Sequence, residues 1–174
     1  MKLSIKKIQK GFTLIELLVV IAIIGILAAV VLVAVNPTEQ LARGRDASKL
    51  STVSGLGKAV QSYYTSQQSA YPPNATWLTA LTTSGEIKQA PTAPATGACP
   101  AVGPNVLSGY CFNTNATPDA VIFAQGESTS NRTKASCGAT DILWIVWSSA
   151  AGKAGFLCTA NITTYPIAGV TILF

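Results

Sequence analysis

The sequence predicts an α+β protein in which a long N-terminal helix packs against a small antiparallel sheet of about four strands. Three observations support this prediction. The chain has an apolar run near its N-terminus, Leu17–Val35, without any charged or hydrogen-bonding side chain. Apolar residues then recur every three or four positions up to Tyr64, which is helical spacing, and short strand-like stretches follow beyond residue 108.

The first two predicted segments are a short leader, residues 1–11, and a hydrophobic helix, residues 12–35. The leader ends in Gly11 and contains four lysines, Lys2, Lys6, Lys7 and Lys10. The apolar run holds nineteen residues. As a helix it would span roughly 28 Å, close to the ~30 Å hydrocarbon core of a bilayer. We therefore predict a single membrane-spanning helix.

Glu16 stands at the edge of this apolar run. A charged side chain in lipid is costly, roughly 2.5–3.5 kcal/mol for an Asp at the centre of a spanning helix. We therefore expect the carboxylate of Glu16 to have a partner. The alternative is that its side chain reaches the lipid headgroups.

Residues 36–66 are predicted to continue the helix as an amphipathic segment. Pro37 removes a helical hydrogen bond and disfavours helical geometry in Asn36, so a kink or short unwound stretch is expected near residues 32–37. The charged cluster Arg43–Asp46 is expected mostly off the apolar face, and so is Lys49. We expect the cluster to be solvated, with salt bridges between subunits as the alternative. Three glycines, each costing up to about 1 kcal/mol relative to alanine, weaken the helix: Gly44, Gly55 and Gly57. The apolar stripe comprises Leu50, Val53, Leu56, Gly57, Val60, Tyr63 and Tyr64.

Residues 67–174 are predicted to form a globular head. Trp77–Leu81 is expected to form a helical turn. Because Trp144 and Trp147 have opposite parity in their strand, we expect one to face the core and the other a neighbour or loop. An antiparallel sheet lying on the helix would bury the apolar faces of the strands. The strand candidates are Tyr110–Thr114, Ala120–Gln125, Ile142–Ser149, Gly155–Thr159 and Gly169–Phe174.

All four cysteines lie beyond the hydrophobic helix, at Cys99, Cys111, Cys137 and Cys158. None forms a C-x-x-C pair, so we expect two disulfides in a segment outside the cytoplasm rather than a zinc site. Three connectivities are possible. We favour Cys99–Cys111 and Cys137–Cys158 because each pair brackets one hairpin or loop. Closing a loop of about twenty residues stabilises the fold by about 3 kcal/mol.

Composition argues against nucleic-acid binding and against an enzyme. The formal charge is +5, but after residue 11 eight basic residues face seven acidic ones, so no basic patch is predicted. The chain has no histidine, which excludes His-dependent catalysis and His-containing zinc sites. We therefore predict no metal, no cofactor and no enzymatic activity. A membrane-anchored binding domain is the alternative class.

The segment Gly11-Phe12-Thr13-Leu14-Ile15-Glu16 resembles the processing site of type IV pilins and of the related pseudopilins of type II secretion. The shared pattern is a basic leader, a glycine, a phenylalanine, a glutamate at the fifth position after the cut, and an apolar helix. This resemblance covers residues 6–35. It implies a pilin-like fold, cleavage between Gly11 and Phe12 by a membrane-bound prepilin peptidase, and N-methylation of Phe12. A secretory signal peptide has a shorter apolar region, about 7–15 residues, and a plain anchor gives no reason for Gly11 or Glu16.

The resemblance further implies a structural subunit held in the inner membrane with a cytoplasmic N-terminus and polymerised by an assembly ATPase and a membrane platform. Its partners would be lipid before assembly, and then copies of itself or related pilins in an extracellular pilus or a periplasmic pseudopilus. In such a filament Glu16 of one copy meets the amino group of Phe12 in its neighbour. Two opposite charges about 4 Å apart attract by roughly 4 kcal/mol at an effective dielectric constant near 20.

Overall fold

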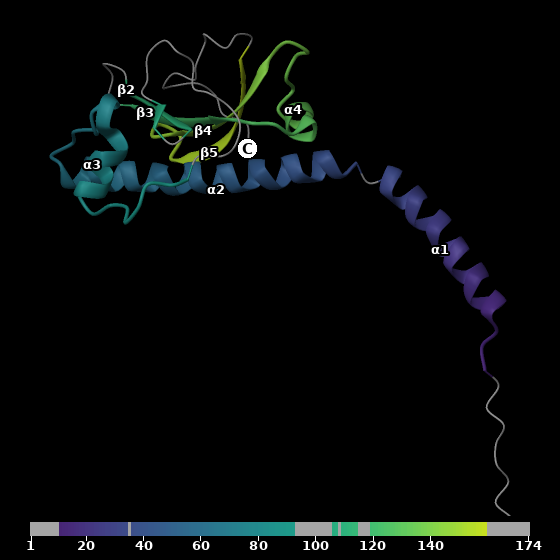
Figure 1. Ribbon diagram of the computed structural model, residues 1–174. Helices are drawn as coiled ribbons and strands as arrows, with labels where there is room; N and C mark the ends of the chain where they lie inside the picture. The colour runs from purple at the N-terminus through teal and green to yellow at the C-terminus, as the bar shows by residue number, and fades with distance from the viewer. Residues whose placement is uncertain (1–10, 35, 93–105, 108, 115–118, 160–174) are drawn as a thin grey trace, which may run out of the picture. The chain divides into compact units, whose positions relative to one another are not determined.

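The computed structural model describes residues 11–34, 36–92, 106–107, 109–114 and 119–159 (Figure 1). The chain divides into two compact units, Met1–Thr38 and Glu39–Phe174. The first unit contains helix α1, and the second contains nearly all of helix α2 together with the sheet. The strand candidate Gly169–Phe174 lies outside the described residues.

Helix α1, Leu14–Ala34, is a run of 21 residues whose one charged side chain is Glu16. It is long and apolar enough to cross a membrane, judged by length and composition. The next helix, α2, begins at Pro37, and Asn36 before it has a positive φ of 34°. Proline suits the first position of a helix because its missing N–H would have no partner there. The interruption predicted near residues 32–37 is therefore confirmed.

Helix α2, Pro37–Ser66, buries one face against the rest of the head. The predicted apolar stripe is confirmed from Val53 to Val60. Toward the N-terminus the same face continues through two charged residues, Asp46 and Lys49, which are 0% and 1% exposed. Steps of three or four positions, as one helix face requires, join six of the buried residues, and Gly57 and Ala59 are buried beside them. The six are Ala42, Asp46, Lys49, Val53, Leu56 and Val60.

Two short helices follow the end of α2. The chain turns through Gln68 and Ser69, whose φ values of 52° and 64° are positive. A 3-10 turn, η1 (Asn74–Thr76), leads into α3 (Trp77–Thr83), which confirms the predicted helical turn and extends it by two residues. Figure 1 shows α3 beside the C-terminal end of α2, and its buried residues share one core with Val60.

The sheet has four substantial strands and a two-residue strand at one edge, all antiparallel, in the order β1-β2-β3-β4-β5. Strands β2 and β3 have the predicted bounds, β4 is one residue shorter, and β5 begins two residues earlier. Each strand pairs with its neighbour in sequence, so the sheet is a meander and the α+β prediction is confirmed. The strands are β1 (Val106–Leu107), β2 (Tyr110–Thr114), β3 (Ala120–Gln125), β4 (Ile142–Ser148) and β5 (Lys153–Thr159).

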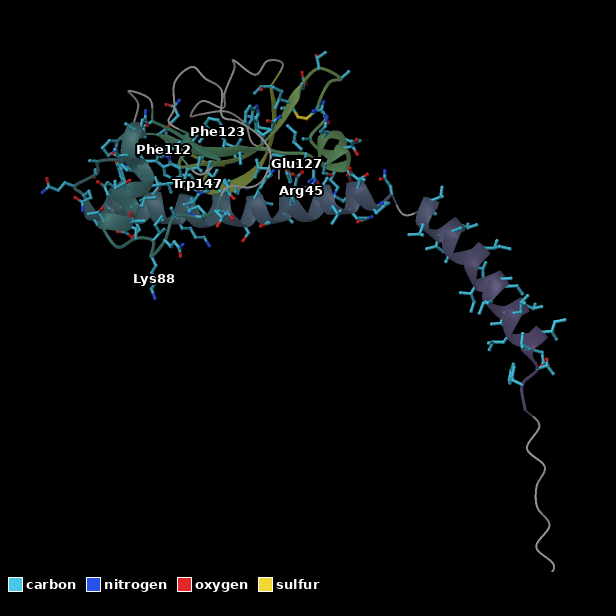
Figure 2. All side chains as sticks on the ribbon, viewed as in Figure 1. Arg45, Lys88, Phe112, Phe123, Glu127 and Trp147 are labelled. Carbon is cyan, nitrogen blue, oxygen red and sulfur yellow. A yellow bond between two sulfur atoms is a disulfide. The ribbon has the colours of Figure 1, made fainter. Side chains whose placement is uncertain are left out.

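Both faces of this sheet are buried. Trp147 lies on the face that packs against α2, together with Phe112 and Ile145 (Figure 2). Trp144 lies on the opposite face, where its ring meets that of Phe123 edge to face at a centroid distance of 5.5 Å. Alternation along β4 explains the division, because successive side chains of a strand point to opposite faces.

Trp147 lies against α2 at the position of Gly57. A Cβ atom added to Gly57 would overlap the Cγ, Cδ2 and Cε2 atoms of Trp147. Gly55, two residues earlier, has no atom within 4 Å of the same construction. Gly57 therefore lets the helix approach the sheet, whereas Gly55 has no such packing role within the head.

Candidate assembly site

The residues that precede α1 are exposed and not helical. Gly11, Phe12 and Thr13 lie outside the helix, and the side chain of Phe12 is 81% exposed. A Cβ atom added to Gly11 would meet nothing within 4 Å. The peptide bond between Gly11 and Phe12, the predicted cleavage site, thus lies in an open stretch of chain.

The carboxylate of Glu16 closes a capping box at the start of α1. Its Oε2 accepts hydrogen bonds from the backbone N–H of Thr13 at 2.8 Å and from the Thr13 hydroxyl at 2.7 Å. The Thr13 hydroxyl in turn accepts from the N–H of Glu16 at 3.3 Å. These bonds satisfy groups that a helix start leaves open. The Thr-x-x-Glu spacing that signals this motif is present in the sequence and was not among the predictions.

Because of this cap, the Glu16 carboxylate needs an external partner for only one of its two oxygens. One carboxylate oxygen already has two donors from its own chain, while Oε1 accepts no hydrogen bond within the part of the chain that the structure describes. Glu16 can therefore start the helix with one oxygen and meet an external cation with the other.

The rest of α1 presents an unbroken apolar surface. None of its residues is buried, and its large apolar side chains range in exposure from 47% at Val20 to 86% at Val33. Each Å² of apolar surface removed from water stabilises by about 25 cal/mol, so this helix is stable only where lipid or protein covers it. Two shallow depressions lie on it. One, of about 360 Å³, is lined by Phe12, Ile15, Glu16, Val19 and Val20, and the other, of about 500 Å³, by Ala29, Val30, Val33 and Ala34.

In the head, four charged residues of α2 bond the segment Gln125–Asn131, and we call this arrangement the polar clamp. The four are Glu39, Arg45, Asp46 and Lys49. Asp46 accepts from the N–H groups of Glu127 and Ser128 at 2.9 and 3.0 Å and from Asn131 Nδ2 at 2.9 Å. Lys49 Nζ donates to the carbonyl of Gln125 at 2.9 Å and to Glu127 Oε1 at 2.5 Å. Arg45 also contacts Glu127, with Nη2 2.7 Å from Oε2.

Glu39 completes the polar clamp at the first turn of α4, Thr129–Lys134. It accepts from the hydroxyls of Ser128 and Thr129 at 2.7 and 2.8 Å, and from the N–H groups of Thr129 and Ser130 at 3.1 and 3.0 Å. The hydrogen bond from the Ser128 side chain, followed by those from Ser130 and Thr129, lowers the pKa of Glu39 far below its ordinary value. Glu39 is therefore ionised throughout the physiological pH range.

These contacts correct the prediction for the charged part of α2. Asp46 is neither solvated nor placed between subunits, because it is fully buried and bonded within its own chain. Lys49 lies on the buried face rather than off it. Burial of a charge is tolerated where hydrogen bonds and an opposite charge replace water, as they do here. Arg43 and Arg45 remain about half exposed, at 47% and 46% of their side chains.

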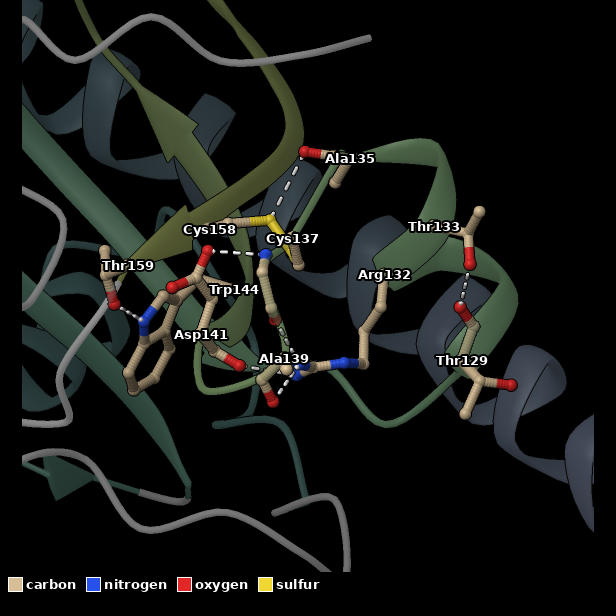
Figure 3. Close-up of a disulfide and its surroundings, with 11 residues drawn as sticks. Thr129, Arg132, Thr133, Ala135, Cys137, Ala139, Asp141, Trp144, Cys158 and Thr159 are labelled. Atoms are coloured by element: carbon tan, nitrogen blue, oxygen red, sulfur yellow. Dashed lines mark hydrogen bonds between the residues drawn. A yellow bond between two sulfur atoms is a disulfide. The ribbon is translucent and has the colours of Figure 1, made fainter.

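A disulfide joins the segment after α4 to strand β5. Cys137 and Cys158 are bonded with their Cα atoms 5.4 Å apart, which confirms that predicted pair (Figure 3). Beside it, Arg132 donates to the carbonyls of Asp141 at 2.6 Å and Gly138 at 3.0 Å. Cys111 is also disulfide-bonded, and its predicted partner Cys99 lies outside the described residues.

The described residues contain no group of three or more His, Cys, Asp or Glu side chains that could hold a metal ion.

Comparison with known proteins gives one family match and several curated relatives. Residues 6–32 match the family described as the prokaryotic N-terminal methylation motif. The fimbrial protein EcpC of Eikenella corrodens is 43% identical over 83 residues, which are 47% of this chain and 52% of that protein. A fimbrial protein of Neisseria meningitidis is 44% identical over 81 residues, 47% of this chain and 45% of that protein.

A shorter match is more similar. The type IV major fimbrial protein FimA of Dichelobacter nodosus is 53% identical over 51 residues, which are 29% of this chain and 31% of that protein. The chain thus spans about half or less of the length of these curated relatives. No solved structure matches.

Proposed function

We propose that this chain is a structural subunit of a type IV pilus-like filament. The premise is that it belongs to the type IV pilin family, which its N-terminal methylation motif and its fimbrial relatives support. The observation that carries the proposal is the 21-residue apolar helix α1, which buries none of its own residues and has Glu16 in its first turn. The apolar surface of such a helix must be covered by lipid or by other protein chains, because its own head does not bury it.

Processing would prepare this helix for assembly. In the proposal a prepilin peptidase cuts between Gly11 and Phe12 and the new N-terminus on Phe12 is methylated. The cut removes the four lysines of the leader, which otherwise hold the N-terminus at the cytoplasmic face. It also creates an ammonium group on Phe12, and methylation leaves that charge in place. The exposed position of the Gly11–Phe12 bond supports this step.

Assembly would then exchange lipid for protein around α1. Before assembly the chain spans the inner membrane once with a cytoplasmic N-terminus. In the filament Glu16 Oε1 receives the ammonium group of Phe12 from an adjoining copy, while Oε2 remains bonded to Thr13. An assembly ATPase and a membrane platform supply the work, and the chain itself has a structural rather than an enzymatic role.

A secretion pseudopilin is the alternative within the same family. Two disulfides favour a fibre exposed outside the cell, because disulfides stabilise small domains in oxidising surroundings. The relatives are fimbrial proteins by name, which favours the same choice. A membrane-anchored binding domain would retain its leader, and a secreted domain would lose the whole helix, so the N-terminal residue of the mature protein separates each of them from a pilin or pseudopilin.

Intact mass and N-terminal sequencing of the protein purified from its membrane test the processing step. The expected first residue is N-methylphenylalanine at position 12. An unprocessed Met1, or a chain that starts beyond residue 35, would rule out the proposed route to a filament.

The charge of Glu16 is tested by Glu16→Gln. Glutamine serves the capping box as well as glutamate does, so this substitution removes the negative charge while keeping the acceptor for Thr13. We expect Glu16→Gln subunits to accumulate in the membrane and to be missing from sheared filaments, whereas the control Glu86→Gln, in the head, assembles normally. Normal filaments from Glu16→Gln subunits would show that the carboxylate charge has no part in assembly.

A further inference from the structure

The acidic side chains of the head are all at least half-buried. The sequence holds seven acidic residues, and the six beyond α1 all lie in the part of the chain that the structure describes. Each of the six accepts a hydrogen bond or an ion pair from its own chain, so the negative charges of the head are shielded by internal contacts. The six are Glu39, Asp46, Glu86, Asp119, Glu127 and Asp141.

The basic side chains of the head are distributed in the opposite way. Eight basic residues lie beyond α1, all of them described, and only Lys49 and Arg132 are not exposed. The head has a formal side-chain charge of only +2, from eight basic and six acidic residues. Its described surface nevertheless carries exposed cations and no exposed acidic side chain. The exposed cations are Arg43, Arg45, Lys58, Lys88, Lys134 and Lys153.

Two of these cations, Arg43 and Arg45, have guanidinium N–H groups to spare. Arg43 pairs with Glu39 through Nε, at 3.2 Å, and Arg45 pairs with Glu127 through Nε and Nη2, at 2.8 and 2.7 Å (Figure 2). Within the described residues, both Nη atoms of Arg43 and the Nη1 of Arg45 make no hydrogen bond. A guanidinium that is held at one edge by a carboxylate can receive a phosphate group at the other.

Arg43 and Arg45 follow the apolar helix closely in the chain. In the proposed role α1 crosses the membrane, and it ends at Ala34. The headgroup layer extends roughly 5–8 Å beyond the hydrocarbon core. Helix α2 begins at Pro37, and Arg43 lies about 9 Å from Pro37 along its axis. The next exposed base of α2, Lys58, lies about 20 Å beyond Arg45.

We propose that Arg43 and Arg45 bind the phosphate groups of anionic phospholipids while the subunit is held in the membrane. This inference rests on the proposed function, which places α1 across that membrane. A basic residue near an anionic membrane surface raises the ratio of bound to free protein about fivefold. A nucleic acid carries its phosphates in a continuous row and would need cations along a longer stretch, whereas separate lipids offer one phosphate to each arginine. The contact would hold the head at the membrane until assembly removes the subunit from lipid.

NMR of the full-length protein in lipid nanodiscs tests the proposal. The sequence contains three arginines, Arg43, Arg45 and Arg132, so isotope-labelled arginine gives three Nε–Hε signals. One set of nanodiscs contains phosphatidylcholine alone, and the other contains equal parts of phosphatidylcholine and phosphatidylglycerol. We expect the signals of Arg43 and Arg45 to shift in the second set, and high salt to reverse the shift. Arg132 is the internal reference, because it donates to two carbonyl groups within the head.

Two variants separate the site from general surface charge. In Arg43→Gln we expect the ratio of bound to free head, judged from the remaining shift of the Arg45 signal, to fall about fivefold. Lys58→Gln is the matched control, because it removes the same charge from an exposed position of the same helix, and it should leave the Arg45 shift as in the wild type. An unchanged Arg132 signal shows that the head of each variant is folded. If Arg43→Gln alters that signal, Arg45→Gln gives the same test through the shift of Arg43.

Three results would overturn the proposal. The first is that phosphatidylglycerol leaves the signals of Arg43 and Arg45 unchanged. The second is an equal loss of the shift in Lys58→Gln, which would show a diffuse attraction of the whole head. The third is a stronger shift of both signals by a DNA oligonucleotide than by phosphatidylglycerol, which would make the partner a nucleic acid. Co-elution with the nanodiscs tests the spanning helix separately, so protein that co-elutes without a shift of the arginine signals contradicts this inference and leaves the proposed function standing.

Discussion

Replacing Gly57 with alanine tests the packing of α2 against the sheet. Alanine favours a helix interior over glycine by about 0.8–1.0 kcal/mol, so propensity alone predicts a more stable protein. The structure predicts the opposite. The added methyl group would overlap three ring atoms of Trp147, a side chain that is only 3% exposed and that is held in a central strand between β3 and β5.

The magnitude follows from these two opposing effects. Overpacking a well-filled core costs about 1–3 kcal/mol, and the overlap with a rigid indole places Gly57→Ala toward the upper end. After the gain in helix propensity, we expect a net loss of about 1–2 kcal/mol in the free energy of unfolding. Gly55→Ala is the matched control two residues away. With no atom near its added Cβ, it should gain up to about 1 kcal/mol.

Urea unfolding of the full-length protein in detergent micelles gives the assay. Tryptophan fluorescence reports on the head directly, because Trp77, Trp144 and Trp147 are all buried there. The two variants should therefore shift the unfolding midpoint in opposite directions. If both raise the midpoint by a similar amount, Trp147 does not pack on Gly57 and the described contact between helix and sheet is wrong.

Three further predictions concern the polar clamp and the disulfide. Lys49→Met should lower the free energy of unfolding by about 3 kcal/mol in the same urea assay, because it leaves the Glu127 carboxylate without one of its cations in a largely buried place; an unchanged midpoint would show that the ion pair is dispensable. Because the folded state lowers the pKa of Glu39 below its ordinary value of 4.5, its ionised form stabilises the head above that pH and this stabilisation is lost as the pH falls through the folded-state value. Thermal unfolding followed from neutral to acidic pH should thus show a loss of stability below pH 4.5 that is smaller in Glu39→Gln, and parallel pH profiles for the two proteins would contradict the assignment. Replacing both Cys137 and Cys158 by serine should cost about 3 kcal/mol through the freed loop between them, measured by urea unfolding against the wild type, and no loss would mean that this bridge does not restrain the unfolded chain.

The regular elements of the head could be predicted because their signals are local. The strands Tyr110–Thr114 and Ala120–Gln125 were predicted with their observed bounds, since a turn-forming segment separates two short β-forming runs. The break before Pro37 was predicted for the same reason: proline acts on its immediate neighbours. The pairing of Cys137 with Cys158 required only a choice among three connectivities.

The polar clamp was missed because its partners lie far apart in sequence. Asp46 and Lys49 bond a segment about eighty residues downstream, and no local pattern links the two. One signal was nevertheless available, since Asp46 and Lys49 continue the spacing of the apolar stripe and so lie on its face. Likewise, Gly55 and Gly57 are equivalent by propensity, and only the position of Trp147 distinguishes them.

The interruption between α1 and α2 has a thermodynamic consequence. Helix formation is cooperative only along an unbroken series of hydrogen bonds, and Pro37 has no amide hydrogen with which to extend the series from α1. Gain or loss of helical order in α1 therefore ends at Asn36 and does not propagate along the backbone into α2. A change of solvent around the first helix, from detergent to lipid or to neighbouring helices, is therefore not passed to the head through backbone hydrogen bonds.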